Sequence, residues 1–211
     1  LNLQPDITGP NVVELSTGVN SGAASQNYDQ WRTRLAIDGG ITIFKRTGQF
    51  NHDIKAGYQY FRGLSDSIQD VFEGINLTVL SGASQTVTQY NSPVDEEEIF
   101  RGSVLHVQDN VAFGRFTFNL GLRFEHTEGF LPEQGAPGGP FSSPRSFPEQ
   151  DVFSWNTLAP RIGVIFDHSP THRIAVKAGY ARYYHAAGTG YVSPPNQNNL
   201  GGTTFTWVDL N

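Results

Sequence analysis

Apolar and polar residues alternate one by one through several long segments of the chain. In the segment 115–126, the apolar residues Phe116, Phe118, Leu120, Leu122 and Phe124 alternate with threonine, asparagine, glycine, arginine and glutamate. Because successive side chains of a β-strand point to opposite faces of a sheet, this pattern predicts a strand with one apolar and one charged face. In a soluble sandwich the apolar face is buried; in an outer-membrane barrel it meets lipid, and the charged face lines the lumen.

The same alternation predicts further strands over about 31–43, 50–62, 98–112, 156–168 and 173–185, and the start of a seventh over 203–209. The register of 98–112 stays open, because Phe100 and Val104 compete with Ile99, Leu105 and Val107 for the apolar face.

Glycine and proline mark special points in these strands. Gly39 and Gly40 predict a bend or bulge in the first strand. Pro160 is expected at the start of the fifth strand, where a missing N–H is tolerated. Residues 1–29 are polar and rich in turn signals, and are interpreted as mostly loop with one short strand over 11–16.

Short and long connections alternate along the chain. The short turns are 45–49, 113–115 and 168–172; the long connections are 63–96, with a hairpin expected over 76–90, then 128–154 and 186–202. Since successive strands run antiparallel, all short turns fall at one end of the sheet. This asymmetry, with strands of roughly 12–15 residues, is typical of outer-membrane barrels with short periplasmic turns and long external loops.

Aromatic and charged residues agree with that interpretation. Aromatic side chains gather near both ends of the strands, as interfacial belts do. Those beside the short turns are Phe44, Phe50, Phe113, Phe116 and Phe166, and those toward the long connections are Trp31, Tyr58, Tyr60, Phe124, Tyr180, Tyr183 and Tyr184. The charged residues of the strands fall on the face opposite the apolar one, for example Arg34, Asp53, Lys55, Arg123 and Arg161.

Composition excludes several classes of function. Only 37% of the 211 residues are hydrophobic, and the net charge of −6 argues against nucleic acid as a partner. The absence of cysteine excludes disulfides and thiolate metal sites. No signal sequence is recognisable at Leu1, and the segment 205–211 ends without a turn, so a fragment of a longer protein is expected.

Three groups of segments resemble a known family. The barrel hairpins of TonB-dependent outer-membrane receptors resemble two pairs of segments in this chain, 107–111 with 118–124 and 158–164 with 175–184. When 145–149 and 207–211 are included, the combination resembles the Oar-like subgroup. The resemblance implies a 22-stranded barrel, plugged by an N-terminal domain, that takes up scarce nutrients with energy delivered by TonB. Residues 1–211 are then part of a single barrel domain in the bacterial outer membrane, without the plug, and 30–211 supply six or seven strands and their external loops.

The partners implied are outer-membrane lipid, an unidentified extracellular ligand and, through the full-length protein, the plug domain and the TonB complex. The substrate stays open between siderophore, glycan and peptide, as does an export role. The alternative is a soluble, secreted β-sandwich that acts as a binding or adhesion module, with the same apolar face buried against a second sheet.

No residue is assigned to a catalytic, cofactor, metal or substrate site, and no enzymatic activity is expected. The acidic run Asp95–Glu98 is interpreted as a solvated rim rather than a cation site, and Asp66, Asp70 and Glu73 lack the spacing of a calcium loop. The segment 209–211 resembles the beginning of such a loop. Aromatic residues at the end of the sixth predicted strand, in the third long connection and in the last segment form either a ligand patch or a membrane-interface belt; these are Tyr183, Tyr184, Tyr191 and Trp207.

Overall fold

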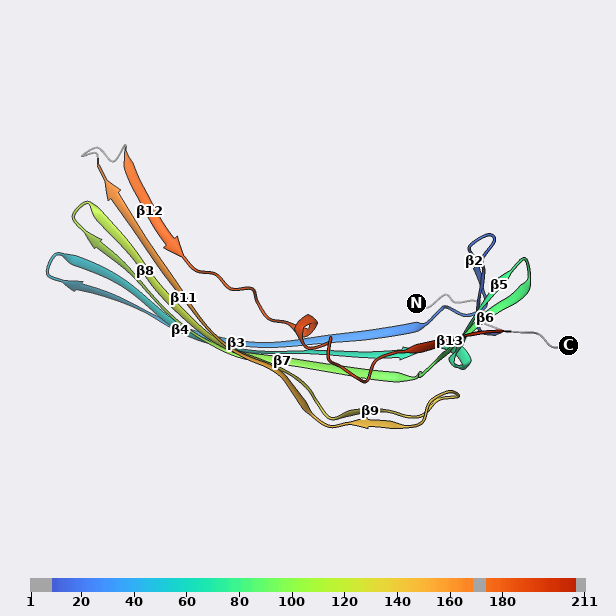
Figure 1. Cartoon of the computed structure of the whole chain (residues 1–211). Helices are drawn as coiled ribbons and strands as arrows, with labels where there is room; N and C mark the ends of the chain where they lie inside the picture. The colour runs from blue at the N-terminus through green and yellow to red at the C-terminus, as the bar shows by residue number, and fades with distance from the viewer. Residues whose placement is uncertain (1–8, 169–173, 208–211) are drawn as a thin grey trace.

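The computed structural model describes residues 9–168 and 174–207, and almost all of its regular structure is β-strand. Six antiparallel strands form one long sheet in the order β12-β11-β8-β7-β4-β3 (Figure 1). Their bounds are Asn27–Thr47 for β3, Phe50–Asp70 for β4, Val94–Phe113 for β7, Phe116–Leu131 for β8, Gln150–Asp167 for β11 and Ala175–Ala181 for β12. Each strand pairs with the one before it in the meander, so the sheet has the up-and-down topology of a barrel wall, with β3 and β12 as open edges.

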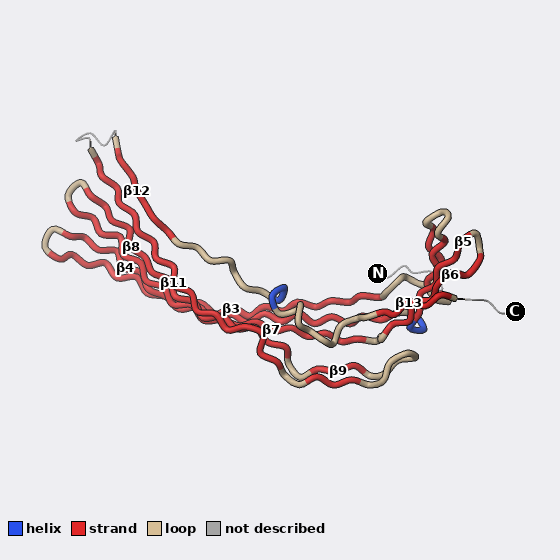
Figure 2. Tube along the Cα trace, in the orientation of Figure 1, coloured by secondary structure: helices blue, strands red, loops and turns tan. Residues whose placement is uncertain are grey.

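The two ends of this sheet differ as the sequence predicts where the connections are described; residues 169–172 of the third predicted short turn lie outside the described residues. Gly48 and Gly114, with φ of 61° and 56°, make two-residue turns between β3 and β4 and between β7 and β8. The long connections lie at the opposite end, where the chain forms smaller elements (Figure 2). These are the 3₁₀ turn η1 (Phe72–Gly74), the hairpin of β5 (Ile75–Leu80) and β6 (Ala83–Tyr90), the hairpin of β9 (Gln134–Ala136) and β10 (Arg145–Phe147), and the 3₁₀ turn η2 (Thr189–Tyr191). The hairpin predicted over 76–90 is confirmed.

A second sheet forms beyond the long connections, in the order β13-β6-β5-β1-β2. It joins β1 (Asn11–Glu14) and β2 (Val19–Ser21), from the segment expected to be mostly loop, to the β5–β6 hairpin, and β1 pairs with β5 in parallel. β13 (Gly202–Thr206) pairs with β6, and the Oγ1 atoms of Thr88 and Thr204 lie 2.9 Å apart. The strand predicted to begin in 203–209 is confirmed as β13 for the described residues of that segment, but it belongs to the second sheet and not to the six-stranded barrel wall.

The alternating residues sort onto two faces as predicted. On one face Val107 of β7 stands opposite Leu122 of β8, which stands opposite Pro160 of β11, and in the next row Leu120 stands opposite Ile162. This register places Leu105 and Val107 on the apolar face and Val104 on the other, which resolves the open register of β7. Leu120 and Ile162 are 44% and 55% exposed, and no second layer of described residues covers this face.

Two local predictions are wrong. The ladder between β3 and β4 runs without a bulge through Gly39–Tyr58 and Gly40–Gly57. Gly40 instead permits close approach, because a Cβ there would lie 3.1 Å from the carbonyl oxygen of Ala56. Pro160 lies inside β11 rather than at its start. Its carbonyl oxygen accepts a hydrogen bond from the N–H of Arg182. Because the N–H and C=O of one residue face the same neighbour in an antiparallel ladder, the missing N–H of Pro160 falls on this side, where β12 leaves the sheet.

Strand lengths also differ from the predictions. β4, β7, β8 and β11 run farther toward the long connections than expected, to Asp70 in β4 and from Gln150 in β11. The segment 128–154 is therefore less irregular than predicted. By contrast, β12 ends at Ala181, and residues 182–201 leave the sheet and continue alongside it toward the long-connection end (Figure 1). No described helix is long and apolar enough to cross a membrane.

Candidate functional site

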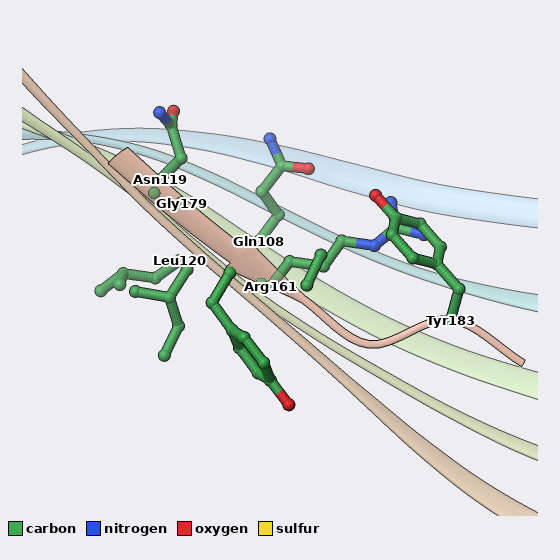
Figure 3. Close-up of a pocket in the computed structure, with 11 residues that line it drawn as sticks. Gln108, Asn119, Leu120, Arg161, Gly179 and Tyr183 are labelled. Carbon is green, nitrogen blue, oxygen red and sulfur yellow. The ribbon is translucent and has the colours of Figure 1, made fainter. Parts of the chain in front are cut away.

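The polar face of the sheet carries paired charged and amide side chains. Figure 3 shows Gln108, Asn119 and Arg161 on one side of the strands and Leu120 on the other. On this face the Arg123 Nη2 atom lies 2.7 Å from the Glu125 Oε2 atom. Pairs of opposite charge on a shared face offset each other, so this face tolerates charge while the reverse face stays apolar.

A cavity of about 230 Å³ lies on the polar face, between β8, β11 and the segment 182–187. Arg123, Glu125 and Arg161 line it from the strands, and the guanidinium of Arg161 lies 5.1 Å from the centre of the Tyr183 ring. Guanidinium groups bind carboxylates and phosphates, and a guanidinium beside an aromatic ring also stacks on planar groups. A hollow of about 410 Å³ beside β12 is lined from both faces of the sheet, and is an open edge rather than a cleft.

Aromatic side chains extend this cavity toward the long connections. The rings of Phe153 and Trp155 stack with centres 4.2 Å apart, and Tyr191 stands edge-on to Trp155 at 5.4 Å. The Tyr191 hydroxyl lies 3.1 Å from Nδ1 of His185, and Val192, next in the chain, is fully buried. The segment 182–192 is thus held against the polar face by aromatic packing.

The predicted aromatic patch is brought together only in part. Tyr183, Tyr184 and Tyr191 lie on one segment, whereas Trp207 follows β13 in the second sheet, where its N–H donates to the oxygen of Gln85. Sequence reasoning missed Phe153 and Trp155 because Phe153 falls in the segment 128–154, interpreted as loop, and Trp155 falls just before the predicted start of the strand. The signal was present, since both continue the odd-numbered polar-face register of β11.

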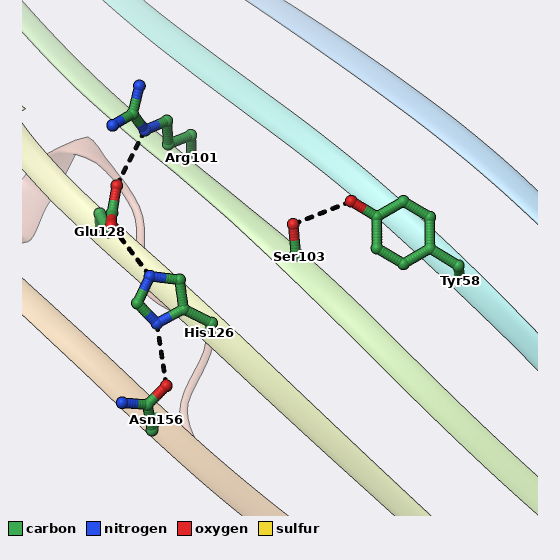
Figure 4. A network of polar contacts seen from close by, with 6 residues as sticks. All are labelled: Tyr58, Arg101, Ser103, His126, Glu128 and Asn156. Carbon is green, nitrogen blue, oxygen red and sulfur yellow. Dashed lines mark hydrogen bonds and ion pairs between the residues drawn. The ribbon is translucent and has the colours of Figure 1, made fainter.

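A polar network on the apolar side marks where the apolar band ends (Figure 4). His126 contacts Glu128 and Asn156 at 2.9 Å each, and Glu128 also accepts from Arg101 at 2.8 Å. On β8, His126 is the tenth residue after Phe116. That is about 33 Å along the strand and, at a barrel tilt of about 40°, about 25 Å in height, which matches the apolar band of outer-membrane barrels.

The opposite limit of that band is aromatic. The ring centres of Phe50 and Phe113 lie 4.6 Å apart, and those of Phe116 and Phe166 lie 4.8 Å apart. All four stand in one cross-strand row beside the short turns. Phe44, predicted with them, pairs with Asp53 and so lies on the polar face. Four of the five aromatic residues predicted for this belt therefore share the apolar face.

The acidic run forms the predicted solvated rim only in part: Asp95 is exposed, whereas Glu98 is buried. Glu98 is only 5% exposed, and burial raises its pKa despite hydrogen bonds to Ser65 and Ser193. Burial and the neighbouring Asp66 carboxylate raise the pKa of Glu97. Among the described residues no group of three acidic or histidine side chains is placed to hold a metal ion, and the segment 209–211 lies outside them.

Comparison with known families identifies the fold family of this chain. A model of the family described as TonB dependent receptor-like, beta-barrel, matches residues 5–209. No curated protein and no solved structure matches the chain. The matched region covers nearly the whole chain and contains both the two-faced sheet and the alternation of short and long connections. The chain therefore belongs to the TonB-dependent receptor-like β-barrel family, and its six-stranded sheet is a partial barrel.

Proposed function

We propose that these residues form part of the wall of a TonB-dependent transporter in the bacterial outer membrane. The apolar face meets lipid, the polar face lines the lumen, and the short turns lie in the periplasm. The observation that carries the proposal is the uncovered apolar face, bounded by the row of phenylalanines at one end and the His126 network at the other. The complete receptor takes up a nutrient through this lumen, with a plug domain and the TonB complex as partners.

The ligand path runs along the polar face. The cavity beside Arg161 and Tyr183 lies where a ligand passing between the long external connections and the lumen would meet guanidinium and aromatic groups. Their role is binding rather than catalysis, and the chain is proposed to act without enzymatic chemistry or a cofactor. Within the family, the Oar-like subgroup is the one whose order of segments this chain resembles.

The absence of cysteine allows a direct test of this topology. Single cysteines are introduced into the receptor at Ser143 in a long connection, at Gln49 in a short turn and at Leu120 on the apolar face, and cells are treated with a membrane-impermeant maleimide. Ser143→Cys is expected to react on intact cells. Gln49→Cys is expected to react only after the outer membrane is permeabilised, and Leu120→Cys is expected to stay unmodified in both cases.

The β-sandwich alternative gives a different pattern. A soluble secreted module presents both ends of the sheet to the medium, so Ser143→Cys and Gln49→Cys react equally without permeabilisation and the protein is recovered in the soluble fraction. That result would refute the transporter proposal. The present structure gives the alternative no support, because the second sheet lies beyond the strand ends and leaves the apolar face open.

A further inference from the structure

Two arginines stand directly opposite each other on the apolar face, at its outer limit. Arg62 of β4 pairs with Arg101 of β7 in the antiparallel ladder. Both continue the register of the apolar face, since Tyr58, four residues before Arg62, stands opposite Leu105, four residues after Arg101. Arginine stays charged at every pH that proteins meet, and like charges directly opposite each other destabilise a sheet. The pair therefore requires a counter-charge.

The described part of the chain gives this pair only one carboxylate within ion-pair distance. Nε of Arg101 lies 2.8 Å from Oε2 of Glu128, and Oε1 of the same carboxylate lies 2.9 Å from Nε2 of His126 (Figure 4). Arg62 forms no hydrogen bond or ion pair with any described residue, and acts on Glu97 only at longer range. The single carboxylate is thus already shared, and the second guanidinium is left without a partner.

The arginine pair is open to molecules outside the barrel wall. Arg62 is exposed, and the side chain of Arg101 is 51% exposed. The residues on either side of Arg62, Phe61 and Gly63, are buried and belong to the polar face. The two guanidinium groups therefore lie on the side of the sheet that faces away from the lumen.

The height of the pair matches the outer head-group region of a bilayer. Arg101 is two residues from Ser103, which stands opposite His126 at the end of the apolar band. Two residues are about 7 Å along the strand and about 5 Å in height at the tilt of a barrel strand. Head groups extend roughly 5–8 Å beyond the hydrocarbon core on each side, so the arginines lie at the level of lipid phosphates.

The chemistry of the site selects a phosphate that is carried on a lipid. A guanidinium binds phosphate through two parallel N–H···O bonds, and basic sites at membrane surfaces bind anionic head groups. Directly below the pair the face is apolar and exposed at Leu35, Leu105 and Phe124. A free phosphate ion gains nothing from this surface, whereas a lipid covers it with its acyl chains.

We propose that Arg62 and Arg101 form a binding site for the phosphate of an outer-leaflet lipid. The phosphate accepts hydrogen bonds from both guanidinium groups and supplies the counter-charge that the pair requires. The acyl chains lie along Leu105, Phe124 and their neighbours. The site rests on the proposed function, since it requires the apolar face to meet lipid and the long connections to lie outside the cell.

The test compares lipids that differ only in phosphate. The complete receptor is reconstituted with equal amounts of lipid A carrying two phosphates and lipid A from which both have been removed, and the lipids retained after gentle detergent release are counted by native mass spectrometry. Arg62→Gln is expected to retain at least threefold less of the phosphorylated form than wild type, and as much of the phosphate-free form. Arg62→Lys, which keeps the charge but not the paired donors, is expected to give an intermediate result.

Arg34→Gln is the matched control. Arg34 of β3 stands opposite Gly63, and its guanidinium lies 6.0 Å from the centre of the Phe61 ring on the polar face, so this variant is expected to behave as wild type. Equal retention of the phosphorylated lipid by wild type and Arg62→Gln overturns the inference and leaves the proposed function intact. So does displacement of that lipid by an equal concentration of inorganic phosphate, because it would make the free ion the ligand. Failure of the receptor to insert into any bilayer overturns both.

Discussion

Replacement of Leu120 by arginine measures directly which face of the sheet meets lipid. Leu120 lies four residues from Phe116 on β8. It is therefore about 13 Å along the strand and about 10 Å above the phenylalanine row, close to the middle of an apolar band about 25 Å tall. Arginine at the bilayer midplane of a barrel costs about 2–4 kcal/mol. The variant is expected to lose this much free energy of unfolding, roughly a 30- to 700-fold change in the equilibrium constant.

The neighbouring residue provides the control. Asn119 is on the same strand at almost the same height, but its side chain lies on the polar side of the sheet in Figure 3. Asn119→Arg introduces the same charge into a polar lumen, where the depth-dependent penalty does not apply. Its free energy of unfolding is expected to stay within about 0.5 kcal/mol of wild type, as for ordinary surface substitutions.

The assay is guanidinium unfolding of the complete receptor in phospholipid vesicles, followed by tryptophan fluorescence. Equal losses for Leu120→Arg and Asn119→Arg would contradict the assigned faces. So would a larger loss for Asn119→Arg, because it would place the polar face in an apolar environment. If both variants match wild type, Leu120 does not lie near the middle of a bilayer, and the height derived from Phe116 is wrong.

Two other substitutions test local structure outside the apolar band. Gly129→Ala adds a Cβ in contact with the Phe153 ring and 2.7 Å from Cγ2 of Val192. We therefore expect the free energy of unfolding to fall by about 1–3 kcal/mol, measured by thermal or denaturant unfolding. Gly121→Ala is the control and is expected to be tolerated, because its Cβ meets nothing nearer than 3.6 Å. The Glu14 carboxylate accepts hydrogen bonds from the Ser16 hydroxyl and from the N–H groups of Ser16, Ser81 and Gly82. These bonds, of which the one from the Ser16 hydroxyl has the largest effect, lower the pKa of Glu14 from 4.5 to about 2. Because the folded-state pKa is the lower one, its stabilisation is complete above about pH 4.5 and is lost as the pH falls through about 2. Hydrogen exchange of the Ser81–Gly82 turn should therefore be faster in Glu14→Gln than in wild type at pH 6 and equal near pH 2; equal exchange at pH 6 would show that the charge does not hold this turn.

The faces of the sheet were predictable because they depend only on neighbouring residues in the sequence. Alternation in 115–126 assigns Leu120 and Leu122 to one face, and short turns of a few residues force adjacent strands to pair. The ends of the strands were less predictable. Toward Asp70, β4 passes through Arg62, Gly63 and Ser65, where both faces lie outside the apolar band, so no alternation marks the continuation of the strand.

Contacts between distant segments were not predictable at all. The pairing of β13 with β6 joins threonine-rich strands more than a hundred residues apart, and the parallel pairing of β1 with β5 follows from no local pattern. The cavity depends on the path of 182–187, which leaves the sheet and lies over its polar face after β12 stops at Ala181. Tyr183 falls within the predicted sixth strand, yet in the structure its ring packs on Arg161 as part of this segment.

The two outer strands of the six-stranded sheet, β3 and β12, have open edges. β3 pairs with β4 over all of its 21 residues and has no described partner on its other side, so a row of backbone N–H and C=O groups is open along the whole strand. β12 has a similar open edge beyond its pairing with β11. In the hydrocarbon region each unsatisfied backbone group costs several kcal/mol, and open sheet edges do not occur there. If the apolar face meets lipid, both edges must therefore pair with further strands, and the sheet can exist in a membrane only as one arc of a closed wall.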